Sequence, residues 1–126
     1  NRASDIMEDY PDFKDWYIAG HSMGGAMASS FAAKHPDEVV GLILLGAYIY
    51  GDVDPADALT IYGTLNTSVA ERVDPSGQVV AIEGGNHAQF GNYGEQRGDA
   101  PASISAEEQQ RIAAEAIVAF IEARGD

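Results

Sequence analysis

Residues 16–25 read Trp-Tyr-Ile-Ala-Gly-His-Ser-Met-Gly-Gly, and this stretch decides the fold. Residues 15–19 are rich in aromatic and β-branched side chains, which predicts a short strand. Residues 24–34 are mostly glycine, alanine and serine, which predicts a helix that packs closely against a sheet. The chain must therefore turn sharply from strand to helix at Ser22. We expect a strained backbone and an exposed hydroxyl at this serine, with Gly20 and Gly24 preventing collisions across the turn.

The predicted turn also places Ser22 at the N-terminus of the helix. A helix N-terminus directs its dipole and its free N–H groups toward a nearby negative charge. The N–H group of Met23 is therefore a candidate donor to an oxyanion formed at Ser22. The Gly-x-Ser-x-Gly pattern is weak alone and becomes specific between a strand and a small-residue helix. The other interpretation is a serine that merely caps a helix.

Strand and helix patterns alternate along the rest of the chain. Further strands are predicted at residues 39–45, 59–62 and 78–82, and the nearly continuous apolar run at 39–45 is typical of a strand buried on both faces. The alternation indicates an α/β fold with a mainly parallel sheet of about four strands and flanking helices. The connections at 46–58 and 63–77 leave room for only one or two helical turns each.

Helices are predicted at both ends of the sequence. Before Pro11, an apolar stripe predicts one helix, and Ser105 and Glu108 form a capping box at the start of the other, which ends near Gly125. The stripes at helical spacing consist of Ala3, Ile6, Met7 and Tyr10 in the first helix and of Ile112, Ala116, Ile117 and Phe120 in the last.

Composition limits the classes of function. The 126 residues suffice for one domain, and 7 basic against 20 acidic residues give a formal net charge of −13. This acidity argues against nucleic acid and anionic membrane surfaces as partners. The absence of cysteine excludes disulfides and thiolate metal sites, and no apolar run approaches the roughly 18 residues of a membrane span. Localisation is not indicated.

Two stretches resemble a known family. Residues 16–25 resemble the nucleophile elbow of α/β-hydrolases, and residues 83–94 are similar to the histidine loop of bacterial α/β-hydrolases close to the dienelactone-hydrolase-like group. The likeness runs from the first helix to the last. It implies hydrolysis of a small-molecule carboxylic ester by a Ser-acid-His triad without a cofactor, with acyl transfer or thioester hydrolysis as a related outcome. Dehalogenases of this fold use an aspartate nucleophile, so Ser22 argues against that chemistry.

His87 is the candidate base, paired with Ser22 as nucleophile. Triads of this fold run in the order Ser, acid, His, and His87 is the histidine that follows the last predicted strand. His21 precedes the nucleophile and, in similar elbows, supports the turn, while His35 ends a helix and is interpreted as structural. The alternative for His87 is an ordinary histidine of a surface loop. No spacing of histidines or carboxylates suggests a metal site.

The triad acid is the irregular member. The resemblance places an aspartate where this chain has Asn66, and an asparagine cannot stabilise an imidazolium by charge. Three interpretations stay open: a weakened hydrolase, another carboxylate such as Asp52 or Asp54 acting instead, or a non-catalytic binding module with the hydrolase fold.

The resemblance also implies a longer domain. A full α/β-hydrolase has about four strands before the elbow strand, and a loop there supplies the second oxyanion donor. We therefore expect residues 1–126 to form a single, truncated domain, the C-terminal half of the fold, although a processed mature start is the alternative. The strand at residues 15–19 would then be an open apolar edge that favours self-association.

Overall fold

The computed structural model describes residues 2–74 and 77–124. One sheet forms the centre, and each neighbouring pair of its strands is parallel. The order of strands in the sheet is their order in the chain: β1 (Trp16–His21), β2 (Val39–Leu45), β3 (Ala58–Gly63) and β4 (Gln78–Ile82). The predicted α/β class with about four parallel strands is confirmed. β1 extends two residues beyond the prediction, because Gly20 and His21 continue the pairing with β2.

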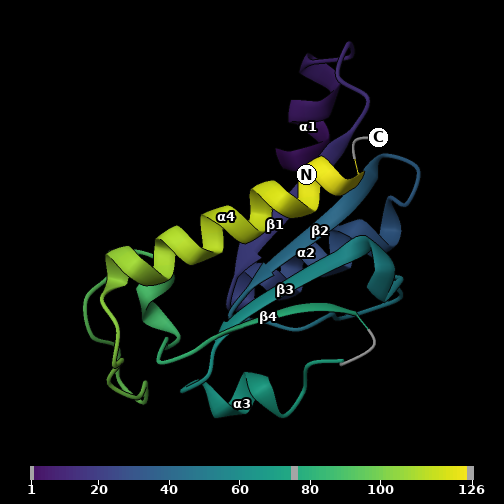
Figure 1. Ribbon diagram of the computed structural model, residues 1–126. Coiled ribbons are helices and arrows are strands. Elements are labelled where there is room, and N and C mark those ends of the chain that lie inside the picture. The colour runs from purple at the N-terminus through teal and green to yellow at the C-terminus, as the bar shows by residue number, and fades with distance from the viewer. Residues whose placement is uncertain (1, 75–76, 125–126) are drawn as a thin grey trace.

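Helices cover both faces of the sheet, with α4 across one face and α2 across the other (Figure 1). The α-helices are α1 (Arg2–Asp9), α2 (Met23–Lys34), α3 (Thr67–Ala70) and α4 (Ala106–Arg124). Single 3₁₀ turns, η1 (Pro55–Asp57) and η2 (Ala88–Phe90), interrupt two loops. In the described residues of the connections after β2 and β3, the helical turns are η1 and α3, in keeping with their short lengths. None of the described helices is long and apolar enough to cross a membrane.

The core is divided into two layers by the sheet. On the α2 side, Leu42 and Leu44 of β2 are 1% and 0% exposed, and on the α4 side Ile43 of the same strand is 3% exposed. β2 is therefore buried on both faces, as its unbroken apolar run predicted. Phe120 of α4 and Ile61 of β3 pack together in the second layer.

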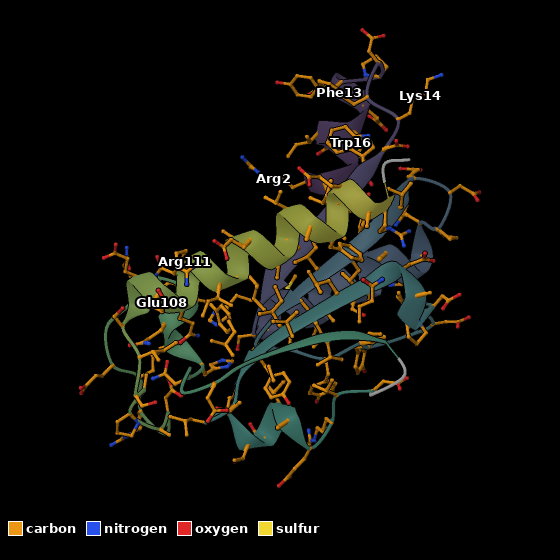
Figure 2. The ribbon with its side chains drawn as sticks, viewed as in Figure 1. Arg2, Phe13, Lys14, Trp16, Glu108 and Arg111 are labelled. Carbon is orange, nitrogen blue, oxygen red and sulfur yellow. The ribbon has the colours of Figure 1, made fainter. Side chains whose placement is uncertain are left out.

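The first helix matches its predicted apolar stripe only in part. Ala3 and Met7 pack against the α2-side core, whereas Ile6 and Tyr10 are 43% and 53% exposed. α1 projects past the start of β1 (Figure 1). Only one side of the helix contacts the core, so two of the four stripe residues are packed against it. Phe13 and Trp16 lie near this helix, at the end of the sheet where β1 begins (Figure 2).

The last helix begins as predicted, with half of the expected capping box. The hydroxyl of Ser105 accepts the N–H of Glu108 at 3.1 Å. The Glu108 carboxylate does not return to Ser105, because it pairs with the Arg111 guanidinium one turn further along the exposed side of α4 (Figure 2). Ile112, Ala116 and Ile117 pack on the sheet with Phe120, so the predicted stripe is confirmed.

Candidate active site

Ser22 lies in the sharp turn between β1 and α2, in the predicted strained conformation. Its φ of 59° and ψ of −124° make it the one non-glycine residue with positive φ in the part of the chain that the structure describes. The turn is held from both sides, because the Ser22 N–H donates to the Leu45 carbonyl at 3.0 Å and the Ser22 carbonyl accepts the Gly25 N–H at 2.9 Å. Such strain costs of order 1–3 kcal/mol and is concentrated at functional sites.

The turn requires one of the two predicted glycines. A Cβ on Gly20 would lie 2.2 Å from the Gly24 carbonyl oxygen, which no side chain tolerates. A Cβ on Gly24 would meet nothing within 4 Å, so the prediction for Gly24 is wrong. The close approach is made one residue later, where a Cβ on Gly25 would lie 2.6 Å from the Ala47 Cβ. Gly24 points into open space at the start of α2.

Three of the residues singled out from the sequence form a chain of hydrogen bonds. His87 Nε2 lies 2.9 Å from Ser22 Oγ, and His87 Nδ1 lies 2.7 Å from Asn66 Nδ2. Ser22, Asn66 and His87 follow the carboxyl ends of β1, β3 and β4, which meet at one edge of the parallel sheet. Met23 directly follows Ser22 as the first residue of α2, where helix N–H groups have no partner within the helix.

The orientation of the Asn66 amide decides where the His87 proton sits. Ser68 Oγ donates to Asn66 Oδ1 at 3.1 Å, and this leaves Nδ2, a donor, facing His87 Nδ1. A neutral imidazole that accepts at Nδ1 carries its proton on Nε2 and so cannot accept the Ser22 proton. Rotating the amide by half a turn would place Oδ1 on Nδ1 and give the opposite tautomer, with the Ser68 hydroxyl then accepting.

Burial sets the charge of the base. It lowers the pKa of His87 below its usual value, and repulsion from His21 lowers that pKa further, while attraction to Asp99 acts in the opposite direction. The imidazole is therefore neutral at neutral pH, as a proton acceptor must be.

The other histidines hold structure together, as predicted. His21 Nε2 donates to the His87 carbonyl at 2.8 Å, and its ring stacks on Tyr93 with an interplanar angle of 9°. His35 Nδ1 donates to the Phe31 carbonyl at 2.9 Å at the end of α2, and its ring stacks on that phenyl group.

The two alternative acids lie away from His87. Asp52 and Asp54 border a hollow with Pro36 and Val39, at the end of the sheet where β2 begins. Asp54 Oδ1 accepts the Ala56 N–H and so caps η1. Because β2 and β3 are parallel, the connection between them runs from the carboxyl end of the sheet to its amino end. Both carboxylates therefore lie at the end of the sheet opposite the site. The expectation that one of them replaces the acid is wrong for this structure.

A hollow of about 370 Å³ lies beside Ser22. Tyr48 and Tyr50 border it, whereas Phe90 packs into the α4-side core and against His21. The hollow also contains Arg72, whose guanidinium donates to the Tyr48 hydroxyl at 3.0 Å and lies 5.7 Å above that ring. The short connection after β3 gave no sequence signal for Arg72.

The residues that hold the histidine loop (residues 83–94) in place were not predicted from the sequence. Gln109 is fully buried, and its amide both donates to the Asn86 carbonyl and accepts the Asn86 N–H. A signal existed, because Gln109 lies on the same helical face as Ala113, Ala116 and Phe120, and a polar residue within an apolar stripe needs a buried partner. Asp99, which contacts the backbone of His87, has no comparable signal.

Within residues 2–74 and 77–124, no group of three or more histidine or carboxylate side chains is arranged to hold a metal ion.

The fold agrees with the comparisons to known proteins. A family described as the alpha/beta hydrolase family matches residues 1–111, so the chain belongs to the α/β-hydrolase family. Monoglyceride lipase of Mus musculus is 34% identical over 56 residues, which are 44% of this chain and 18% of the lipase. A solved structure titled marine microorganism esterase shares the fold with a TM-score of 0.54 and 14% identity, over 91% of this chain and 73% of that one.

Proposed function

We propose that this chain is a serine hydrolase of carboxylic esters, with Ser22 as nucleophile and His87 as base. The observation that carries the proposal is the 2.9 Å approach of His87 Nε2 to Ser22 Oγ, at a serine with strained backbone and a helix N-terminus beneath it. A serine that only caps a helix needs neither a strained backbone nor a histidine paired with its hydroxyl, whereas an activated nucleophile has both. The names of the two similar proteins, a lipase and an esterase, support an ester as substrate.

The reaction proposed has two halves. His87 takes the Ser22 proton at Nε2 as Oγ attacks the acyl carbon, and the Met23 N–H donates to the oxyanion. His87 then gives that proton to the leaving alkoxide, and water attacks the acyl-enzyme with His87 again as base. The hollow beside Ser22 would hold the acyl or alcohol part of a small ester. The resemblance of residues 83–94 to the dienelactone-hydrolase-like group is a further reason to propose a small carboxylic ester as substrate, and thioester hydrolysis would use the same steps.

Asn66 makes this a weakened hydrolase. Its amide can orient the ring of His87, but it carries no charge to stabilise the imidazolium formed when Ser22 attacks. The second candidate is a binding module without catalysis, and the facing of Asn66 Nδ2 to His87 Nδ1 favours it, because this arrangement holds the unproductive tautomer.

A fluorophosphonate probe, which reacts with activated serines, separates the two candidates. We expect wild-type protein to be labelled and Ser22→Ala to be unlabelled, because no other serine is paired with a histidine among the described residues. Ser30→Ala, in the same helix and away from the site, should be labelled like wild type. Labelling no stronger than that of the heat-unfolded protein would instead favour the binding module.

The outer edge of β1 has no neighbouring strand among the described residues. β1 is the first strand of the sheet, its Ala19 is exposed, and Met23 and Met27 of the adjoining helix are 78% and 70% exposed. An unpaired strand edge with apolar surroundings invites another strand. We propose that another strand pairs here, from an upstream segment or a second copy, and that an upstream segment supplies the second oxyanion donor.

Size-exclusion chromatography with light scattering tests the pairing of this edge. We expect the 126-residue chain to self-associate and Ala19→Lys to shift it toward monomer, because lysine on an edge strand opposes pairing. Val118→Lys, on the exposed side of α4, serves as the charge-matched control. A monomeric wild-type chain with one sharp melting transition would refute pairing with a second copy and the need for a partner strand at this edge.

A further inference from the structure

A carboxylate outside the Ser22–His87–Asn66 chain of hydrogen bonds binds the backbone of His87. Asp99 Oδ1 accepts the His87 N–H at 3.0 Å, and Asp99 Oδ2 accepts the Ala88 N–H at 2.8 Å. Asp99 is far along the loop that leaves β4 and returns to α4 (Figure 1). Both of its oxygens are thus used on two successive N–H groups, and hydrogen bonds from a charged acceptor are about twice as strong as neutral ones.

His21 also donates to the His87 carbonyl, and further contacts hold the same loop at different points. Gln109 binds the backbone of Asn86, and the Ser103 N–H donates to the Gly84 carbonyl at 2.9 Å where the loop closes. These contacts fix the residues before His87 and the base of the loop. Asp99 fixes the peptide groups on both sides of the His87 Cα, and these determine where the imidazole points.

We propose that Asp99 is the positioning residue of His87 and supplies the negative charge that Asn66 cannot. The imidazole must meet Ser22 Oγ at one nitrogen and Asn66 at the other, which leaves little freedom in the His87 backbone. A carboxylate that binds two N–H groups removes that freedom and also places a full charge behind the ring. The catalytic part of this inference rests on the proposed function.

The electrostatic setting of His87 supports this role. His21 from β1, whose ring centroid lies 4.9 Å from that of His87, and Asp99 from the loop of His87 both act on the ring. Tyr93 stacks on His21, and Tyr48 and Arg72 line the same hollow as His87. Asp99 raises the pKa of His87 against the lowering by burial and by His21. Removing the Asp99 charge leaves the two lowering effects unopposed, so the pKa of His87 should fall further.

A nuclear magnetic resonance titration of the His87 imidazole tests the inference without any substrate. In Asp99→Asn, one amide oxygen replaces two carboxylate oxygens, and the amide nitrogen cannot accept an N–H. We expect the His87 pKa to decrease relative to wild type. Glu95→Gln removes one negative charge from an exposed position in the same loop and should leave that pKa close to wild type. Asp99→Glu, which keeps the charge, should restore most of the difference.

Fluorophosphonate labelling gives the second readout. We expect Asp99→Asn to slow Ser22 labelling about tenfold, the equivalent of one charge-assisted hydrogen bond at roughly 1.4 kcal/mol. If wild-type protein is not labelled, the proposed hydrolase function fails, while the titration still decides the role of Asp99. An unchanged His87 pKa in folded Asp99→Asn would overturn the inference.

Wild-type protein provides the test if Asp99→Asn does not fold. The amide protons of His87 and Ala88 should both lie downfield and exchange slowly with solvent, because each is bound to a carboxylate oxygen. Amide protons at ordinary shifts that exchange quickly would show that Asp99 does not hold these groups in solution and would overturn the inference as well.

Discussion

Asn66→Asp is expected to accelerate fluorophosphonate labelling and ester hydrolysis at Ser22 by about 10³-fold. The new carboxylate would face His87 Nδ1 at the present 2.7 Å position and accept a hydrogen bond from Nδ1–H. That bond selects the tautomer with a free lone pair on Nε2, the nitrogen next to Ser22 Oγ. The carboxylate charge would also stabilise the imidazolium that forms as Ser22 attacks.

The size of this gain follows from charge and distance. A carboxylate about 4 Å from an imidazolium gains about 4 kcal/mol at the effective dielectric constant of 20 suited to such sites, and 1.36 kcal/mol corresponds to a factor of ten. Asn66 is 9% exposed, so the free protein must bury a new charge beside a neutral ring. We therefore expect a lower melting temperature together with the higher rate, with Ser68 still donating to the new carboxylate.

Two controls make the measurement specific. Asn92→Asp introduces the same charge into the histidine loop at an exposed position, where its oxygen can still accept from Gln110, and should leave the rate unchanged. The double variant Asn66→Asp with Ser22→Ala should show no labelling. A folded Asn66→Asp protein that reacts no faster than wild type would mean that the missing charge does not limit the site, and would strengthen the case for a binding module.

The fold could be predicted because local patterns in this chain agree with its tertiary structure. The apolar run at 39–45 and the strand at 78–82 have the observed bounds. The first is marked by its unbroken apolar run, typical of burial on both faces, and the second by its β-branched residues between glycines. The prediction failed where burial depends on how much of a helix is covered. Ile6 and Tyr10 fit the apolar stripe of the first helix, yet both are exposed, because α1 meets the body along a narrow strip.

The site could be predicted only as far as chain order carries the information. Ser22, Asn66 and His87 follow the carboxyl ends of β1, β3 and β4 in a parallel sheet, so their meeting follows from the topology. The amide orientation of Asn66 depends on Ser68, and the backbone of His87 depends on Asp99, twelve residues away. These contacts depend on how irregular loops fold, and loops have no periodic sequence pattern from which their contacts could be predicted.

The glycines of the turn show the same limit, because the motif presents Gly20 and Gly24 as equals and the structure separates them. Gly20→Ala would place a Cβ 2.2 Å from the carbonyl oxygen of Gly24, inside the backbone of the first turn of α2. No change of rotamer relieves a clash between a Cβ and a main-chain oxygen. The turn that holds Ser22 would have to open, which would also move Oγ away from His87.

We expect Gly20→Ala to destabilise the fold by about 3 kcal/mol, the upper part of the usual range for overpacking, and to lower the melting temperature by about 10 °C. Gly24→Ala is the matched control. The new Cβ would meet nothing within 4 Å, and alanine favours the helical backbone at this position. We therefore expect Gly24→Ala to stabilise the fold by about 0.4–1 kcal/mol. Thermal unfolding followed by circular dichroism, at equal protein concentration, measures both. Equal melting temperatures for the two variants would contradict the close approach at Gly20, and a loss of Ser22 labelling confined to Gly20→Ala would tie that approach to the reactive geometry of the serine.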